Sequence, residues 1–214
     1  MDEKKQALFD SQKELLDTFL SHGAITKAQY DKSLGDLRIK MGVDGASFAK
    51  KSADTVRRAE PHELPQILSI YAAARQRMRE SGNPHQWGDR HPSDDAVWND
   101  IETGRCYLVV QGNKIAGVFY FAAGDDPTYR EIFDGAWPDD APYGVIHRIA
   151  AAPDAHGVLA AATAFALTQV DEVRIDTHRD NRIMQSALTK QGFTYCGTIY
   201  VADGTPRMAY AKRR

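Results

Sequence analysis

Residues 145–169 read VIHRIAAAPDAHGVLAAATAFALTQ, and this stretch decides the fold. The run from Val145 to Ala151 is short and apolar, as expected of a buried strand. Pro153 cannot donate to a sheet ladder, so the strand is expected to end before it. The alanine-rich remainder predicts a helix that begins near Gly157. The first N–H groups of a helix have no partner within it, so this helix start is a ready site for a pyrophosphate.

The strand end and the loop after it match a known ligand-binding pattern. They resemble the acyl-CoA-binding motif of the GNAT superfamily, the Gcn5-related N-acetyltransferases, which reads hydrophobic-A-V-x-P and then Q/R-x-x-G-x-G/A. Residues 149–153 match the strand end, and residues 156–161 occupy the loop. Gly157 and Ala161 fit the pattern, whereas His156 replaces Arg or Gln and Leu159 replaces a glycine.

A second motif supports the same resemblance. Residues 181–193 read NRIMQSALTKQGF, which follows the family pattern N-x-x-A-x-x-x-Y-x-K-x-G-F. The Asn, Lys, Gly and Phe positions match, whereas Met184 replaces the alanine and Leu188 replaces the tyrosine. Two motifs in the family's order are specific, and the resemblance covers about residues 55–214.

The remaining patterns predict strands and helices in the order β-α-α-β-β-β-α-β-α-β-β from Thr55 onward. This order predicts an α/β (α+β) fold, a mixed sheet with helices on both faces. The resemblance implies that the sheet is mostly antiparallel. It also implies that the central strand parts from the next one, so that a thioester can lie in the gap.

Three segments are expected along the chain: a helical pair at 1–41, a linker at 42–54 and a GNAT acyltransferase domain at 55–214. In the first segment, leucines and Phe19 repeat at helical spacing, and Thr26 is suited to cap a second helix. Two short helices bury too little surface to be stable alone. We expect them to dock on the main domain or on a partner, such as a second copy of the chain in a homodimer.

Composition narrows the class of protein. The chain has 214 residues with 43% hydrophobic content, enough for one packed domain and a small appendage. A net charge of -2 argues against broad nucleic-acid binding. Cys106 and Cys196 belong to no metal-like cluster and are interpreted as reduced thiols of a cytoplasmic protein. No apolar run is long enough for a membrane span, and no metal site is expected.

The segment from Gly124 to Tyr143 is longer than an ordinary hairpin loop and carries six carboxylates and several aromatic rings. Two interpretations stay open. It is either a solvated insertion whose aromatic side chains pack on the sheet, or a lid over the acceptor pocket. An acidic lid would favour a cationic amine.

His147 is the first candidate for a catalytic base, because histidine titrates near neutral pH. The alternative is a buried histidine that is bonded to the insertion at 124–143. Strand alternation predicts that His147, Ile149 and Ala151 share one face, and that Arg148 faces the other way and forms an ion pair within the fold. Asp176 and Tyr195 are the further catalytic candidates. Asp176 could instead fix local structure, and Tyr195 could approach the thioester or pack in the core.

The resemblance implies acetyl-CoA as co-substrate and assigns its binding to the strand end, the loop and the second motif. The residues so assigned are Ile149, Ala150, Ala151, His156, Gly157, Val158, Leu159, Ala160, Ala161 and Asn181. The candidates for the walls of the acceptor site are Trp87, Glu131, Trp137 and Tyr143.

The expected function is an N-acyltransferase that moves an acyl group from acetyl-CoA to a primary amine of a small molecule or peptide by direct attack. Two alternatives stay open. Leu159 and Leu188 favour a catalytically weak acyl-CoA-binding regulatory domain. The N-terminal helices favour an interaction protein that recruits partners.

Overall fold

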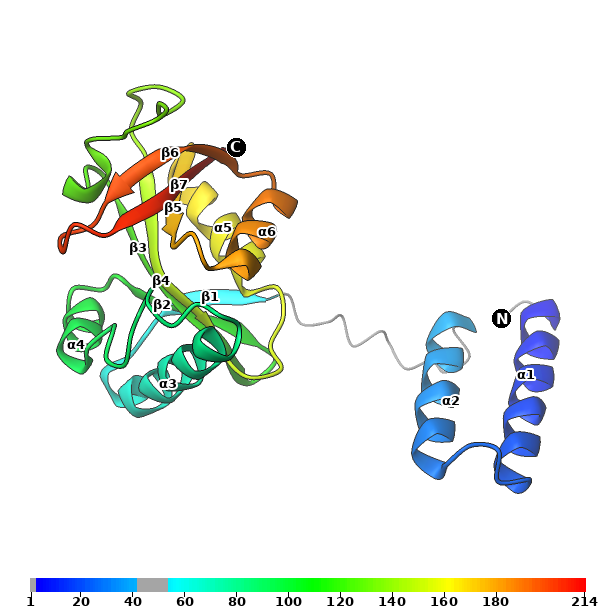
Figure 1. The fold of residues 1–214 in the computed structure, drawn as a ribbon. Helices are drawn as coiled ribbons and strands as arrows, with labels where there is room; N and C mark the ends of the chain where they lie inside the picture. The colour runs from blue at the N-terminus through cyan, green and yellow to red at the C-terminus, as the bar shows by residue number, and fades with distance from the viewer. Residues whose placement is uncertain (1–2, 42–53) are drawn as a thin grey trace. The chain divides into compact units, whose positions relative to one another are not determined.

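The structure of the protein, a computed structural model, describes residues 3–41 and 54–214. The chain divides into two units, residues 1–53 and 54–214, and each is described by itself (Figure 1). Of the expected linker at 42–54, all but Asp54 lies outside the described residues. None of the described helices combines the length and the apolar character that a membrane crossing requires.

The N-terminal unit is a helical pair, as the sequence predicts. Helix α1 spans Glu3–Ser21 and helix α2 spans Lys27–Met41. Thr26 caps α2, because its hydroxyl accepts from the Gln29 N–H at 3.2 Å while the Gln29 side chain accepts from the Thr26 N–H at 2.8 Å. The hairpin encloses a small core in which Phe9, Tyr30 and Leu37 are buried.

The C-terminal unit has the predicted order of elements. They are β1 (Thr55–Arg58), η1 (Pro61–Glu63), α3 (Leu64–Glu80), α4 (Asp94–Glu102), β2 (Cys106–Gln111), β3 (Lys114–Ala123), η2 (Pro127–Tyr129), β4 (Gly144–Ala151), α5 (Val158–Gln169), β5 (Glu172–Thr177), α6 (Arg182–Lys190), β6 (Thr194–Tyr200) and β7 (Pro206–Arg213). Ser93 caps α4 through the Ala96 N–H, and Asn181 caps α6.

The seven strands form one sheet in the order β1-β2-β3-β4-β5-β7-β6. All neighbours are antiparallel except β4 and β5. That parallel pair is joined only at Gly144–Val173 and Val145–Arg174, and beyond these residues the two strands are no longer paired. The predicted mixed, mostly antiparallel sheet is therefore confirmed, with its ladder interrupted where a parting was expected.

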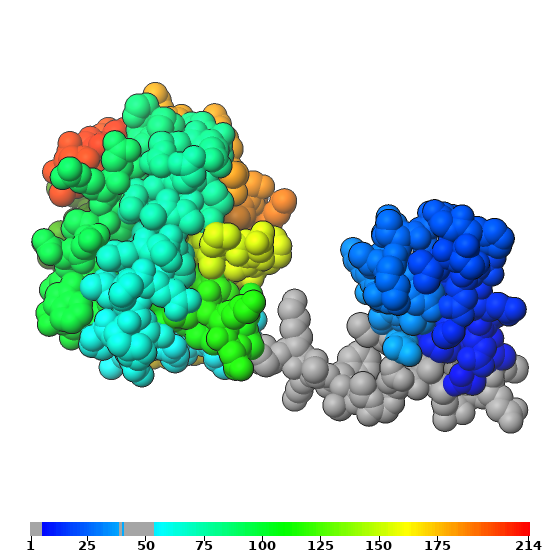
Figure 2. All heavy atoms as spheres, turned by 90° about the horizontal axis from the view of Figure 1, so that it is seen from below, coloured from blue at the N-terminus to red at the C-terminus, as the bar shows by residue number. Residues whose placement is uncertain are grey.

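Helices cover both faces of the sheet (Figure 1). On one face, α5 and α6 pack over a cluster that includes Phe119, Ile146 and Leu188. On the other face, α3 and α4 pack over a cluster that includes Leu108 and Val118. Figure 2 shows the cyan segment that leads from β1 into α3 lying across this unit as seen from below.

A bulge in β4 overturns two predictions. Tyr120 of β3 pairs with His147, and Val118 pairs with Ala150. Between these pairs, the single residue Phe119 lies opposite two residues of β4, Arg148 and Ile149. The extra residue is Arg148, whose φ of 50° is in the left-handed region.

The bulge changes which side chains share a face. His147 and Arg148 both contact the Tyr120 ring, whereas Ile149 and Ala151 pack against the cluster beneath α5. The prediction that His147 shares a face with Ile149 and Ala151 is wrong, as is the prediction that Arg148 points away from His147. The predicted ion pair of Arg148 is confirmed, because Asp100 binds it.

Candidate active site

A cavity of about 680 Å³ opens where β4 and β5 part. Its walls come from the loop between α3 and α4, from η2, from the middle of β4, from the end of β5, from the start of α6 and from the turn between β6 and β7. Segments far apart in the chain therefore line one cavity, and small-molecule sites usually lie in concave cavities of this kind.

His147 projects into this cavity between two carboxylates. Its Nε2 lies 3.0 Å from Asp126 Oδ2, and its Nδ1 lies 3.7 Å from Asp176 Oδ1. An ionised carboxylate can only accept, so Nε2 carries the proton in the hydrogen bond to Asp126. The hydrogen bond with His147 lowers the pKa of Asp126 to about 2, and the Thr128 N–H adds to this effect. Asp126 is therefore ionised throughout the physiological pH range.

Asp176 is held by its own partners. The Tyr129 hydroxyl donates to Asp176 Oδ1 at 2.7 Å, and Arg207 Nε lies 3.8 Å from Oδ2. Burial raises the pKa of Tyr129 well above its ordinary value, so this hydroxyl remains a donor. Asp176 thus both faces the imidazole and anchors η2, which agrees with either of the roles considered for it.

The start of α5 has the shape expected of an anion site. Gly157 precedes the helix with a φ of 76°, a conformation that glycine adopts without strain. Gln111 donates to the His156 carbonyl at 2.8 Å and so braces the preceding loop. The N–H groups of the first helical residues are left without helical partners. Leu159 packs its side chain against the core cluster, so it lies against the protein interior.

Close packing brings this helix start down onto the sheet. A Cβ built on Gly117 of β3 would lie 2.5 Å from the Val158 side chain and 2.8 Å from the Ala150 carbonyl. Only glycine allows this approach. The start of α5 therefore lies directly beside the C-terminal half of β4, as the ligand-binding motif requires.

Asn181 is fixed at the opposite wall. Its Oδ1 accepts from the Met184 N–H at 3.1 Å, and its Nδ2 donates to Gln86 Oε1 at 2.9 Å. Gln86 also accepts from the Thr177 hydroxyl at 3.3 Å. Gln86 thereby ties the loop after α3 to the end of β5 and to the start of α6, a role that the sequence did not indicate.

Of the four acceptor-wall candidates, only Trp87 lines the cavity; it is buried and meets Tyr71 edge-on. Trp137 and Tyr143 instead enclose the Arg174 guanidinium, 4.1 and 3.7 Å from their ring centres. Glu131 lines a separate, smaller cavity of about 180 Å³.

The acidic insertion contributes both to the cavity and to the packing on the sheet. Its first residues, Asp126 and Thr128, line the main cavity. Its later aromatic side chains pack on the sheet through Arg174 and Tyr129.

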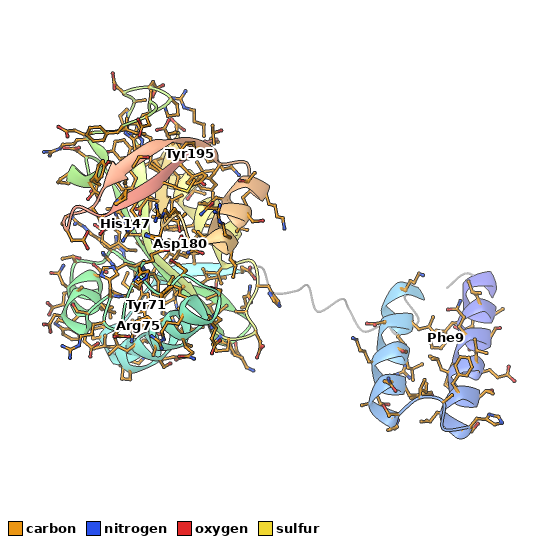
Figure 3. The ribbon with its side chains drawn as sticks, viewed as in Figure 1. Phe9, Tyr71, Arg75, His147, Asp180 and Tyr195 are labelled. Carbon is orange, nitrogen blue, oxygen red and sulfur yellow. The ribbon has the colours of Figure 1, made fainter. Side chains whose placement is uncertain are left out.

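Tyr195 is not brought to the cavity. It is 47% exposed on β6 and packs edge-on against Tyr210, its partner in β7. Figure 3 shows it well apart from His147. Among the catalytic candidates, the structure thus brings together His147 and Asp176 and leaves Tyr195 outside.

A comparison with family models finds no match, and a comparison with curated proteins finds none either. Solved structures do match. A GNAT-family acetyltransferase from Streptococcus agalactiae is 29% identical with a TM-score of 0.68, and the match covers 76% of this chain and 96% of that one. One from Listeria monocytogenes is 21% identical with a TM-score of 0.55, covering 75% and 95%.

The C-terminal unit is a domain of the GNAT superfamily. One departure from the superfamily's pattern can be placed in this GNAT domain. Leu188, at the position of the usual tyrosine, is fully buried in the cluster beneath α5. A leucine has no proton to give, so any acid for the leaving thiolate has to come from elsewhere.

Other site residues of the GNAT domain were missed at the level of sequence. Asp126 was visible only as one of several acids in the insertion, and Tyr129 only as one of its aromatic residues. The pattern Asp-Pro-Thr at 126–128 does indicate a turn in which the aspartate caps the Thr128 N–H, as observed at 2.9 Å. No local signal links it to His147, 21 residues away.

Among residues 3–41 and 54–214, no group of three or more His, Cys, Asp or Glu side chains is arranged to hold a metal ion.

Proposed function

We propose that the protein is a GNAT-type N-acyltransferase that uses acetyl-CoA and passes the acyl group directly to a primary amine of a small molecule or peptide. The observation that carries the proposal is the position of His147. It projects into the cavity at the parting of β4 and β5, with a carboxylate on either side.

The gap between the strands would hold the pantetheine arm. The Ala152 N–H donates to the Ala116 carbonyl of β3 at 2.8 Å, so by alternation the main-chain groups of Ala151 point away from β3 and toward the gap. Arg77 already donates to the Ala151 carbonyl, which leaves the Ala151 N–H as the group that would bind the arm. The start of α5 would hold the pyrophosphate.

His147 would accept the proton of the acceptor amine. The amine nitrogen attacks the thioester carbonyl carbon, the carbon–sulfur bond breaks, and the thiolate departs. Since Nε2–H is engaged with Asp126, Nδ1 is the position open to the proton. The imidazolium formed in this way would face Asp176 at Nδ1 and Asp126 at Nε2, an arrangement of base and orienting carboxylate found in other enzymes.

A thiol-release assay over a panel of amines tests the proposal. We expect turnover with at least one amine class and a strong dependence on His147. Tight acyl-CoA binding without thiol release for any amine would instead support a regulatory acyl-CoA-binding domain, the alternative that Leu159 and Leu188 favour.

A further inference from the structure

A buried ion pair lies directly behind the bulge of β4. Asp100 of α4 is 5% exposed, and its two carboxylate oxygens accept from Arg148 Nε at 2.9 Å and from Arg148 Nη2 at 2.8 Å. Such a two-point contact fixes the direction of the guanidinium as well as its distance. Burial raises the pKa of Asp100, and the neighbouring Arg148 works against that rise.

The main chain at the bulge is held from the same side. The Tyr71 hydroxyl of α3 donates to the Arg148 carbonyl at 2.9 Å. A non-glycine residue at a φ of 50° is unfavourable and persists only where its surroundings enforce it. Asp100 and Tyr71 supply that enforcement, one through the side chain of Arg148 and the other through its carbonyl.

Arg148 also borders the cavity. Its guanidinium lies over the Tyr120 ring at 4.5 Å, and the His147 imidazole contacts the same ring at 5.6 Å between centroids. A guanidinium released from Asp100 would add an uncompensated positive charge next to His147. That charge would oppose the arrival of a proton on the imidazole.

We propose that Asp100 is a positioning residue for the reaction: by holding Arg148 against α4, it maintains the bulge that directs His147 into the cavity and neutralises the cation beside it. The kinetic consequence of this role rests on the proposed function, whereas the geometry does not. Asp100 itself lies behind Arg148 and is not among the residues that line the cavity.

The test compares Asp100→Asn with Asp95→Asn, a matched change at an exposed position of the same helix. We expect D100N to lower kcat/KM by between about tenfold and a hundredfold, as small misplacements of catalytic groups do. The acidic limb of its pH–rate profile should move to lower pH, because the freed guanidinium disfavours the imidazolium. D95N should follow the native profile.

Two double variants examine the bulge itself. D100N/R148G removes the ion pair and places glycine where φ is positive, so the bulge is retained and most of the lost rate should return. D100N/R148A removes the same charges but disfavours that φ, so it should recover less. Equal recovery in both, or none in either, would overturn the proposal, and this comparison holds even if D100N alone does not fold.

A readout independent of turnover separates this proposal from the proposed function. The ring signals of His147 can be titrated by NMR in the native protein and in D100N. If the native protein transfers no acyl group, the proposed function fails, and the titration alone decides the positioning role. A titration midpoint that moves to lower pH in D100N supports the role, and an unchanged midpoint overturns it, as do native kinetics in D100N.

Discussion

The replacement Asp126→Asn isolates the contact between Asp126 and His147. It removes one negative charge but keeps an oxygen that can accept from the Thr128 N–H. The hydrogen bond with His147 is the largest cause that lowers the pKa of Asp126 from 3.8 to about 2. In a fully buried site, this change in pKa would correspond to about 2 kcal/mol of folding free energy. Because the side chain is 22% exposed, screening by water reduces the value to about 1 kcal/mol.

The sign of the pH dependence follows from the direction of the pKa change. A carboxyl with a lowered pKa in the folded state stabilises the fold when it is ionised in both states, above about pH 4. That contribution is lost as the pH falls toward 2. The difference in unfolding free energy between the native protein and D126N should therefore be largest at neutral pH and should narrow between pH 5 and pH 3.

Urea unfolding measures this difference. With a denaturant slope of about 2 kcal/mol per molar urea, the midpoint of D126N at pH 7 should fall by about 0.5 M. Asp125→Asn is the matched control, since Asp125 pairs with Arg130 at the surface, where such pairs contribute little. Identical midpoints for D126N and D125N at pH 7, or a gap that does not narrow in acid, would refute the carboxylate–imidazole contact.

Three further outcomes are expected. His147→Ala should reduce turnover by about a hundredfold or more while leaving CoA affinity unchanged, and native turnover would remove His147 from the reaction. Gly157→Ala should lower the free energy of unfolding by about 1 kcal/mol, because the φ of 76° at this position disfavours alanine. The same variant should bind CoA more weakly in calorimetry, and an affinity equal to that of the native protein would argue against the start of α5 as the pyrophosphate site. Removal of residues 1–53 should preserve acyl transfer, whereas any change of oligomeric state seen by light scattering would assign association to the helical pair.

The order of elements could be predicted because its signals are local. Pro153 and Gly157 separate β4 from α5, and Ser93 and Asn181 cap α4 and α6 by accepting from the N–H group three residues further on. Each of these residues acts within a few positions of itself in the chain. Sequence periodicity could therefore place the strands and helices of this unit before their packing was known.

The bulge could not be predicted in the same way. Alternation assumes that every residue of a strand pairs with the next strand, and Arg148 departs from it because of partners far along the chain. Asp100 precedes Arg148 by 48 residues and Tyr71 precedes it by 77. Trp137 and Tyr143 were misplaced for a similar reason, since their packing depends on Arg174, a residue of another strand.

The leucine at 188, in place of the usual tyrosine, and the histidine at 147 have unequal consequences for an acyl transfer. A thiolate is a fair leaving group, because a thiol has a pKa of only about 8.5, and water can protonate it after it departs. A primary amine with a pKa of about 10.4 is neutral in only about one molecule in 2,500 at pH 7, so removal of its proton weighs far more on the rate. A chain with leucine at 188 can therefore remain an enzyme if His147 takes that proton.

This argument predicts a difference in pH dependence. Between pH 7 and pH 9 the rate of His147→Ala should rise more steeply than the rate of the native protein, because in the variant solvent alone supplies the neutral amine. Parallel profiles for the two proteins would mean that His147 does not remove the proton.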